Sequence, residues 1–445
     1  MARVLSSDVV RLKHSALTLP PVSETVVRSA AWAGAYGLLF IYYYSFLDYG
    51  LNLWDEGGFA NGALRTYHGQ MAMRDFNPIG YLPGRYIYAA WFFDWFGVSL
   101  HSLRLSVAVF TPAMPLLVFA IARRLMPRGF AVLAAAMMAS APAMYYNRFF
   151  PFFCILILFT VVRWLEKPTR RRTFWMAAAM VLCIPFKMEV SLFAAAVAGI
   201  CGLLRNDPYP ARPGIFSGGG RGLRPGLLGL GAAVVLLLVY LWRYQVFQKF
   251  VDIVTHTHAA WGNPFPDLLP FFLLLRELGP HLIFERLLFY LALGVYAAVL
   301  ILVGRAWMRQ RGPDPQARLL LAVVGFGLGA YGLVVWRAGF DNLVRTLPPF
   351  YILAAYLLFR LKARPLLFFY EMNVAHGFYV GSIGAVQQNT QRLTGNRLNV
   401  WTHPHEAQWV NRVLERIHSV TRPHDPILAL PLNPLFYFLT DRTNP

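Results

Sequence analysis

The sequence predicts an all-α polytopic membrane protein with about 11 transmembrane helices, a long first external loop and the start of a small external α/β domain. Hydrophobic residues make up 57% of the chain, charged residues only 14%, and the mean hydropathy is +0.46. This composition is far more apolar than that of a soluble globular domain. Apolar runs of about 15 to 23 residues, separated by short basic or Pro/Gly-rich segments, fit helices that cross a bilayer.

The net charge of +20 is concentrated in the short loops between apolar runs. This distribution is typical of cytoplasmic loops, so it indicates membrane topology and attraction to anionic lipid, and it argues against nucleic acid as a partner. It places the N-terminus in the cytoplasm. The three cysteines all lie within apolar runs without CxxC spacing, so they predict neither a disulfide framework nor a zinc site.

Residues 1–385 are expected to form the transmembrane domain. The first span leaves the membrane through residues 48–104, a long external loop whose stretch 86–96 suits a helix lying at the interface. Two short runs that meet near Lys187 are expected to pack inside the bundle, with either local thinning of the bilayer or a kink. The expected spans lie at about 28–47, 105–122, 130–147, 149–163, 226–246, 282–304, 318–336, 346–360 and 365–385, with the short runs at 174–189 and 190–204.

An odd number of spans places the C-terminal segment, residues 386–445, on the external side. Residues 406–417 have helical periodicity, whereas residues 426–430 and 435–439 are expected to form strands. The segment therefore reads as the beginning of a soluble α/β domain.

The first external loop carries two adjacent carboxylates, Asp55 and Glu56, close to the end of a membrane helix. Ionised carboxylates remain solvated there, yet they can reach a lipid head group. Trp54 can anchor the loop at the interface, and Gly57 allows close approach of another backbone or a ligand. We expect Asp55, and less directly Glu56, to take part in catalysis, and we expect Asp48 to be structural.

Four arginines are placed to meet a lipid phosphate. One follows the proline–glycine turn of the first loop, and the others lie at predicted external turns. Guanidinium groups bind phosphate oxygens in a bidentate manner, although an arginine at such a position can also simply reach toward lipid head groups. The candidates are Arg85, Arg148, Arg337 and Arg345.

Further polar residues are candidates for a substrate cavity. Lys187 and Glu189 lie between apolar runs, where ionisable groups are costly and functional roles are frequent. Because they are two residues apart, a regular helix would direct them to different sides and prevent their pairing. The loop residues Tyr81 and Tyr86 and the pair His256 and His258 complete this set. The two histidines have no third ligand nearby in sequence, so they favour a metal site only weakly.

The order of these features resembles the GT-C superfamily of membrane glycosyltransferases, in particular the bacterial relatives of the protein O-mannosyltransferases and of the lipid A aminoarabinose transferase. The resemblance rests on several short segments that together extend over almost the whole chain. They are Trp54-Asp55-Glu56, Pro83-Gly84-Arg85-Tyr86, Phe96-Gly97-Val98-Ser99, Arg104-Leu105, Ser140-Ala141-Pro142, Asn147-Arg148, Arg345 with Pro348-Pro349, and the terminal segment 437–445.

The resemblance implies that Asp55 activates the acceptor and that the sugar donor is a polyprenyl phosphate lipid. It also implies an enzyme of the bacterial inner membrane that acts on the periplasmic face in cell-envelope glycan biosynthesis. Many relatives have a second acidic residue after the hairpin at 145–148, where this chain reads Arg148-Phe149-Phe150-Pro151. Glu56 and Glu189 are the candidates to substitute for it, and the resemblance leaves open a divalent cation, Mg or Mn.

The residues suit such a reaction, because glycosyl transfer needs a base for the acceptor hydroxyl and cations for the departing phosphate. The family implies a single displacement that inverts the anomeric centre. The acceptor could be a glycan, a lipid or a protein hydroxyl. Alternatives are a transporter or lipid flippase, whose pathway would use Lys187 and Glu189, a non-catalytic assembly subunit, and an oligosaccharide transferase with a diphosphate-linked donor.

Overall fold

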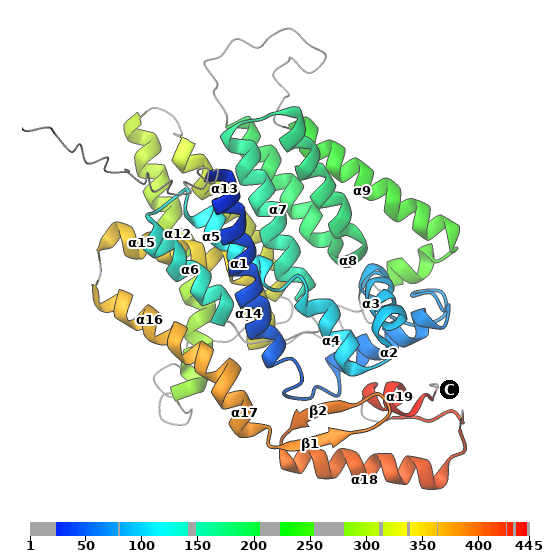
Figure 1. Cartoon of the computed structure of the whole chain (residues 1–445). Helices are drawn as coiled ribbons and strands as arrows, with labels where there is room; N and C mark the ends of the chain where they lie inside the picture. The colour runs from blue at the N-terminus through cyan, green and yellow to red at the C-terminus, as the bar shows by residue number, and fades with distance from the viewer. Residues whose placement is uncertain are drawn as a thin grey trace, which may run out of the picture.

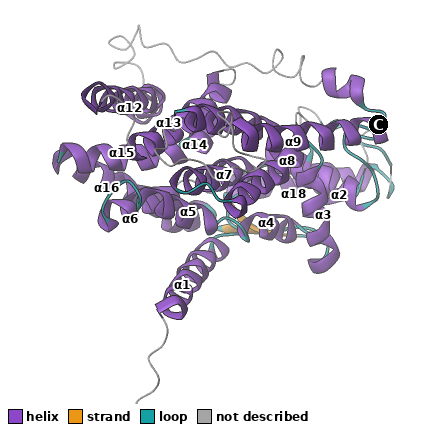
Figure 2. Ribbon diagram, turned by 90° about the horizontal axis from the view of Figure 1, so that it is seen from above, coloured by secondary structure: helices purple, strands orange, loops and turns teal. Residues whose placement is uncertain are grey.

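The computed structural model describes residues 24–78, 81–140, 148–204, 223–252, 280–310, 315–335, 339–362, 364–423, 425–429 and 433–442. The chain is predominantly helical, with one small hairpin of strands beside the helical bundle (Figures 1 and 2). Its helices are α1 (Glu24–Ser45), α2 (Asp55–Tyr67), α3 (Gly84–Phe96), α4 (Leu100–Ala108), α5 (Ala113–Ala122), α6 (Arg128–Ser140), α7 (Phe149–Glu166), α8 (Arg170–Leu203), α9 (Leu223–Arg243), α12 (Pro280–Gln310), α13 (Pro315–Val335), α14 (Phe340–Thr346), α15 (Pro348–Leu361), α16 (Arg364–Tyr379), the π-helix Val380–Gly384, α17 (Ala385–Gln388), α18 (Pro404–Val420) and α19 (Leu435–Thr440).

Several of these helices are apolar enough to cross a membrane, as the composition predicts. Among the described residues, five meet the requirements of length and composition: Leu100–Ala122, Phe149–Glu166, Arg170–Leu203, Leu287–Arg309 and Pro315–Val335. Shorter apolar helices lie at Arg128–Ser140, Val234–Arg243 and Pro348–Leu361. The helical fold with several apolar helices is therefore confirmed, whereas the number of about 11 spans remains a prediction.

Helix α8 consists of two arms that fold back on each other. Lys187 has non-helical torsion angles (φ −153°, ψ 82°), two residues after a proline inside the helix. The Ser191 hydroxyl donates a hydrogen bond of 2.7 Å to the carbonyl of Met180. In a straight helix, residues eleven positions apart would be separated by about 16 Å along the axis. The kink expected near Lys187 is thus confirmed, and it places that residue at the tip of the turn.

The segment 48–104 is more helical than predicted, because it has α2 in addition to the helix expected at 86–96, which is confirmed as α3. It contains α2, α3 and the start of α4, and α2 begins at Asp55 itself. The Asn52 side-chain oxygen accepts hydrogen bonds from the backbone N–H groups of Trp54 and Asp55, at 3.1 and 2.8 Å. An asparagine that accepts from these unpaired amides favours a helix start, and acidic residues in the first turn complement the helix dipole.

The predicted strand, turn and strand near the C-terminus are wrong. The strands are β1 (Gln391–Thr394) and β2 (Asn399–Thr402), which pair antiparallel before the amphipathic helix α18. The expected second strand forms the helix α19, preceded by Pro434, and four consecutive side chains of this helix are buried. A short apolar run buried on all sides has no periodicity that distinguishes a strand from a helix.

The C-terminal segment packs directly against the segment that carries the candidate carboxylates. The backbone of Trp401 in β2 exchanges two hydrogen bonds of 2.7 Å with Asp48 and Gly50. At α19, a Cβ atom on Gly57 would lie 2.4 Å from the backbone nitrogen of Leu435, so only glycine permits this approach of α19 to α2. Figure 1 shows the hairpin and α19 beside α2, where they support its first turn.

Candidate active site

Asp55 occupies the first turn of α2, at the positive end of the helix dipole. Its side chain is half-buried, whereas the neighbouring Glu56 is buried. Asp55 therefore has access to both solvent and protein, which an acceptor-binding carboxylate requires.

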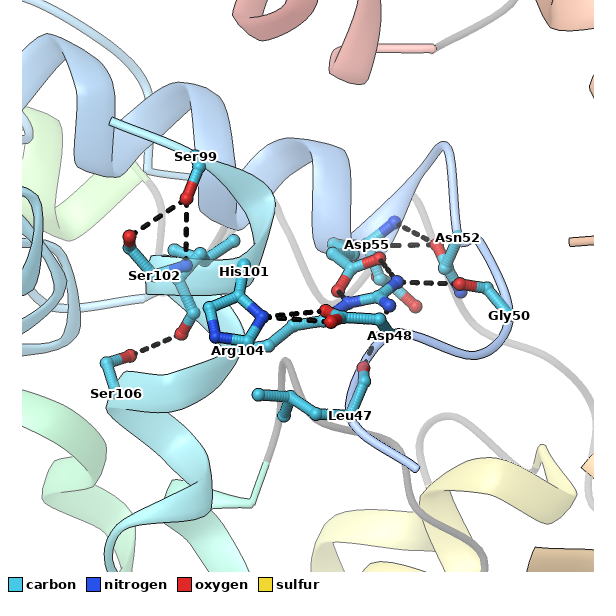
Figure 3. A network of polar contacts seen from close by, with 12 residues as sticks. Leu47, Asp48, Gly50, Asn52, Asp55, Ser99, His101, Ser102, Arg104 and Ser106 are labelled. Atoms are coloured by element: carbon cyan, nitrogen blue, oxygen red, sulfur yellow. Dashed lines mark hydrogen bonds and ion pairs between the residues drawn. The ribbon is translucent and has the colours of Figure 1, made fainter. Parts of the chain in front are cut away.

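The Glu56 carboxylate forms a buried ion pair with Arg104 of α4. Arg104 Nε lies 2.6 Å from Glu56 Oε1 and Arg104 Nη2 lies 2.8 Å from Oε2. The same guanidinium donates to the carbonyls of Leu47 and Gly50, at 3.0 and 2.7 Å. One arginine thus ties the end of α1, the following turn and the first turn of α2 together (Figure 3). A bidentate arginine of this kind fixes geometry as well as charge.

Asp48 holds the other side of this network, as expected for a structural residue. Its carboxylate oxygens lie 3.0 and 2.9 Å from Nδ1 of His101, in the first turn of α4 (Figure 3). The start of α4 therefore carries two side chains, His101 and Arg104, that each bind a carboxylate of the 48–56 segment.

Arg85 lies in an aromatic box rather than at the protein surface. Its guanidinium carbon is 3.9 Å from the ring centroid of Tyr81, 4.4 Å from that of Phe59 and 5.0 Å from that of Tyr86. The side chain is only 3% exposed, and its Nε has no hydrogen-bond partner among the described residues. A buried guanidinium donor without a partner is costly, so this position favours an anionic ligand.

Close packing brings this box against the turn of α8. A Cβ atom on Gly84 would lie 2.6 Å from the carbonyl oxygen of Pro185, so the start of α3 approaches α8 through a glycine. Lys187 then places its Nζ 4.5 Å from the Tyr81 ring centroid.

Lys187 also pairs with Glu189, at 3.6 Å, which contradicts the expectation that the two could not meet. On a regular helix, side chains two residues apart point in different directions. Lys187, however, has non-helical torsion angles at the break of α8, so this rule does not apply to the pair.

Tyr81 reports the electrostatic character of this end of the bundle. Burial acts to raise the pKa of its phenol. The positive charges of Lys187, Arg85 and Arg345 act in the opposite direction. Their combined effect outweighs burial and the smaller effect of the Asp55 carboxylate, so the pKa of Tyr81 lies below its ordinary value. Positive charge therefore dominates the environment of this phenol, and Arg85 and Lys187 both lie against its ring.

The remaining candidates lie elsewhere or outside the described residues. Arg148 is buried at the start of α7, and its guanidinium carbon is 5.1 Å from the ring centroid of Tyr43 in α1. Arg337, His256 and His258 lie outside the described residues. Within the described ranges, no group of three or more His, Cys, Asp or Glu side chains is arranged to hold a metal ion.

Arg104, the partner of Glu56, is one of the residues that carry the family resemblance, but no role is predicted for it from the sequence. An arginine inside an apolar run is a signal that can be read from sequence, because a buried charge needs a partner. Phe59, which stacks on Arg85, carries no such signal.

No protein-family model matches the chain, and no curated protein sequence matches it either. Solved structures match it over nearly its full length, and at 13–16% identity they show a shared helical fold. The predicted resemblance is thereby confirmed at the level of the fold.

Two crystal structures of ArnT from Cupriavidus metallidurans are similar to this chain. The apo form has a TM-score of 0.60 at 15% identity and covers 95% of this chain and 86% of ArnT. The form bound to undecaprenyl phosphate has a TM-score of 0.57 at 16% identity and covers 94% and 85%. The Archaeoglobus fulgidus oligosaccharyltransferase in complex with Zn and sulfate has a TM-score of 0.50 at 13% identity, covering 93% of this chain and 62% of its own.

Proposed function

We propose that this protein is an integral-membrane glycosyltransferase. It transfers a sugar from a polyprenyl-phosphate-linked donor to a hydroxyl acceptor on the external face of the bacterial inner membrane. The observation that carries the proposal is the pair of cations on the Tyr81 ring, Arg85 at 3.9 Å and Lys187 at 4.5 Å from its centroid, with the Arg85 Nε buried and without a partner among the described residues. The solved ArnT structure bound to undecaprenyl phosphate, which shares the fold, supports a lipid phosphate as the ligand.

In this proposal Asp55 is the general base. Its half-buried carboxylate accepts the proton of the acceptor hydroxyl as that oxygen attacks the anomeric carbon. The bond between this carbon and the phosphate oxygen breaks, and the polyprenyl phosphate leaves with the electron pair. A single displacement inverts the anomeric centre.

Cations near Tyr81 stabilise the negative charge that develops on the leaving phosphate. Arg85 has a buried donor available among the described residues, and Lys187 contributes a point charge from the turn of α8. A preorganised cation in a water-poor site is worth more to the transition state than the same cation in water. Arg345 has the same role from α14, and Arg148 and Arg337 are further candidates for phosphate binding.

Glu56 has a supporting role in this scheme, because both of its carboxylate oxygens already accept from Arg104. It holds the first turn of α2 in place and thereby fixes the direction of the Asp55 side chain.

The test is transfer of radiolabelled sugar from a panel of polyprenyl-monophosphate and polyprenyl-diphosphate sugars in membranes with matched expression. Asp55→Asn should lower transfer by about 10²-fold to 10⁴-fold, which is the usual contribution of a general base. Asp94→Asn, on the exposed face of α3, is the matched control and should retain transfer within about twofold.

Undiminished transfer by Asp55→Asn would remove Asp55 as the base. Absence of transfer from every donor would favour the transporter or assembly-subunit alternatives. Transfer only from diphosphate-linked donors would mean that Arg85, Lys187 and Arg345 bind a diphosphate, which three positive charges can also neutralise.

A further inference from the structure

A second group of cations lies at the opposite end of α7 from the candidate active site. Phe149 begins α7 and packs against Phe59 of α2, with ring centroids 5.9 Å apart. The helix has 18 residues, so its last residue, Glu166, lies about 25 Å along the axis from that contact. We call the cations around Glu166 the basic end; its members are Arg123, Arg124, Arg163, Lys167, Arg170, Arg171 and Arg172.

Three arginines of the basic end converge on the single carboxylate of Glu166. The nitrogen–oxygen distances are 2.5 Å for Arg124, 3.9 Å for Arg163 and 3.8 Å for Arg172. These side chains come from the loop after α5, from α7 and from α8 respectively. One negative charge cannot neutralise three positive charges, so this junction between helices has an excess of positive charge.

The other four cations add to this excess. Arg123, Lys167, Arg170 and Arg171 are exposed, and within the described part of the chain none of them forms an ion pair. Arg170 and Arg171 lie in the first turn of α8, at the positive end of its dipole, where cations are unfavourable and anions are favoured.

Aromatic side chains next to the basic end indicate that it faces a lipid head-group region. Phe174 and Trp175 follow the arginines by one turn of α8 and are 63% and 55% exposed. Exposed aromatic residues beside arginines at the end of an apolar helix are typical of a membrane–water interface. This combination favours a membrane lipid over a soluble acidic protein as the source of negative charge.

We propose that the basic end is a binding site for the phosphate head group of an anionic glycerophospholipid. The head group lies at the junction of the α5–α6 and α7–α8 connections, and Arg170, Arg171 and Lys167 provide its cations. The site is independent of glycosyl transfer, because it lies at the far end of α7 from Asp55.

Native mass spectrometry of the full chain in detergent tests this proposal, with cardiolipin as the probe and phosphatidylcholine as the zwitterionic comparison. The pair Arg170→Gln/Arg171→Gln should weaken the first cardiolipin-binding step by about 10-fold to 30-fold and leave phosphatidylcholine binding unchanged. The pair Arg412→Gln/Arg416→Gln on α18 is the control, because it removes the same charge from an exposed helix elsewhere.

A second pair, Arg170→Lys/Arg171→Lys, keeps the charge and should retain cardiolipin affinity within about threefold. Equal weakening by the α18 pair would show a non-specific charge effect and overturn the site. Unchanged cardiolipin affinity in Arg170→Gln/Arg171→Gln would overturn it as well and would leave an acidic protein as the partner of this surface. All substituted side chains are exposed, so we expect unchanged thermal unfolding in each variant.

Discussion

The two ends of α7 both carry clusters of positive charge, but the clusters differ in their surroundings. At the end that packs on α2, Arg85 is buried within an aromatic box and has a donor without a partner among the described residues. At the other end, Arg170 and Arg171 are exposed, and the neighbouring arginines share the carboxylate of Glu166.

This difference shows that the number of cations does not identify a site in a membrane protein with a net charge of +20. Burial makes each charge near Asp55 energetically significant, because water does not screen it. At the basic end the charges are exposed, so water and salt screen the attraction of each one for an anion. Several such charges together are needed to attract a lipid. Substitutions at the two ends should therefore have very different effects.

The largest effect is expected from breaking the buried ion pair beside Asp55. Arg104→Met leaves the Glu56 carboxylate buried without its bidentate partner and should destabilise the protein by about 3 to 5 kcal/mol. The measurement is the unfolding free energy in mixed detergent micelles. The double variant Arg104→Met/Glu56→Leu removes both charges and should recover most of the loss.

At the basic end, Glu166→Gln breaks a partly exposed cluster and should change stability by less than about 1 kcal/mol. Equal destabilisation by Arg104→Met and Glu166→Gln would mean that burial does not distinguish the two ends.

The next largest effect concerns turnover. Lys187→Gln removes a cation from the environment of Tyr81 and should lower kcat for glycosyl transfer by about 10²-fold to 10³-fold, because its charge acts on the developing phosphate. Arg171→Gln at the basic end is the control and should retain kcat within about twofold. A loss confined to KM in Lys187→Gln would indicate ground-state binding alone.

A smaller effect should appear in the ionisation of Tyr81. Lys187 is the strongest of the positive charges that lower the pKa of this phenol, so Lys187→Gln should raise that pKa. The phenolate would then form only at higher pH than in the wild type. Fluorine NMR of protein labelled with 3-fluorotyrosine measures this shift, and Arg171→Gln should leave the Tyr81 resonance unchanged.

Much of the fold could be predicted from sequence, because lipid-facing helices must be long and apolar. Residues 282–304, for example, are expected to be helical and lie within α12, and residues 318–335 of the expected span 318–336 lie within α13. The position of Asp55 shortly after the first helix could also be predicted, because the apolar run of that helix ends just before it.

The errors occur where local pattern does not determine structure. Asp55 and Glu56 look alike in sequence, but only Glu56 turns toward Arg104, which lies 48 residues away. The pairing of Lys187 with Glu189 depends on a break in α8 whose torsion angles cannot be read from spacing. The run at 435–439 is helical although its uniformly apolar sequence has no periodicity that distinguishes a helix from a strand.

The most direct test of the account measures donor binding separately from chemistry. It compares the affinity for polyprenyl phosphate of wild type, Asp55→Asn and Arg85→Gln in detergent. The account predicts that Asp55→Asn binds the lipid as the wild type does while it fails in transfer, and that Arg85→Gln binds about tenfold or more weakly because a buried cation is missing. Wild-type affinity in Arg85→Gln would contradict the role of Arg85 in phosphate binding. Loss of lipid binding in Asp55→Asn would contradict the role of Asp55 as a base that does not bind the phosphate.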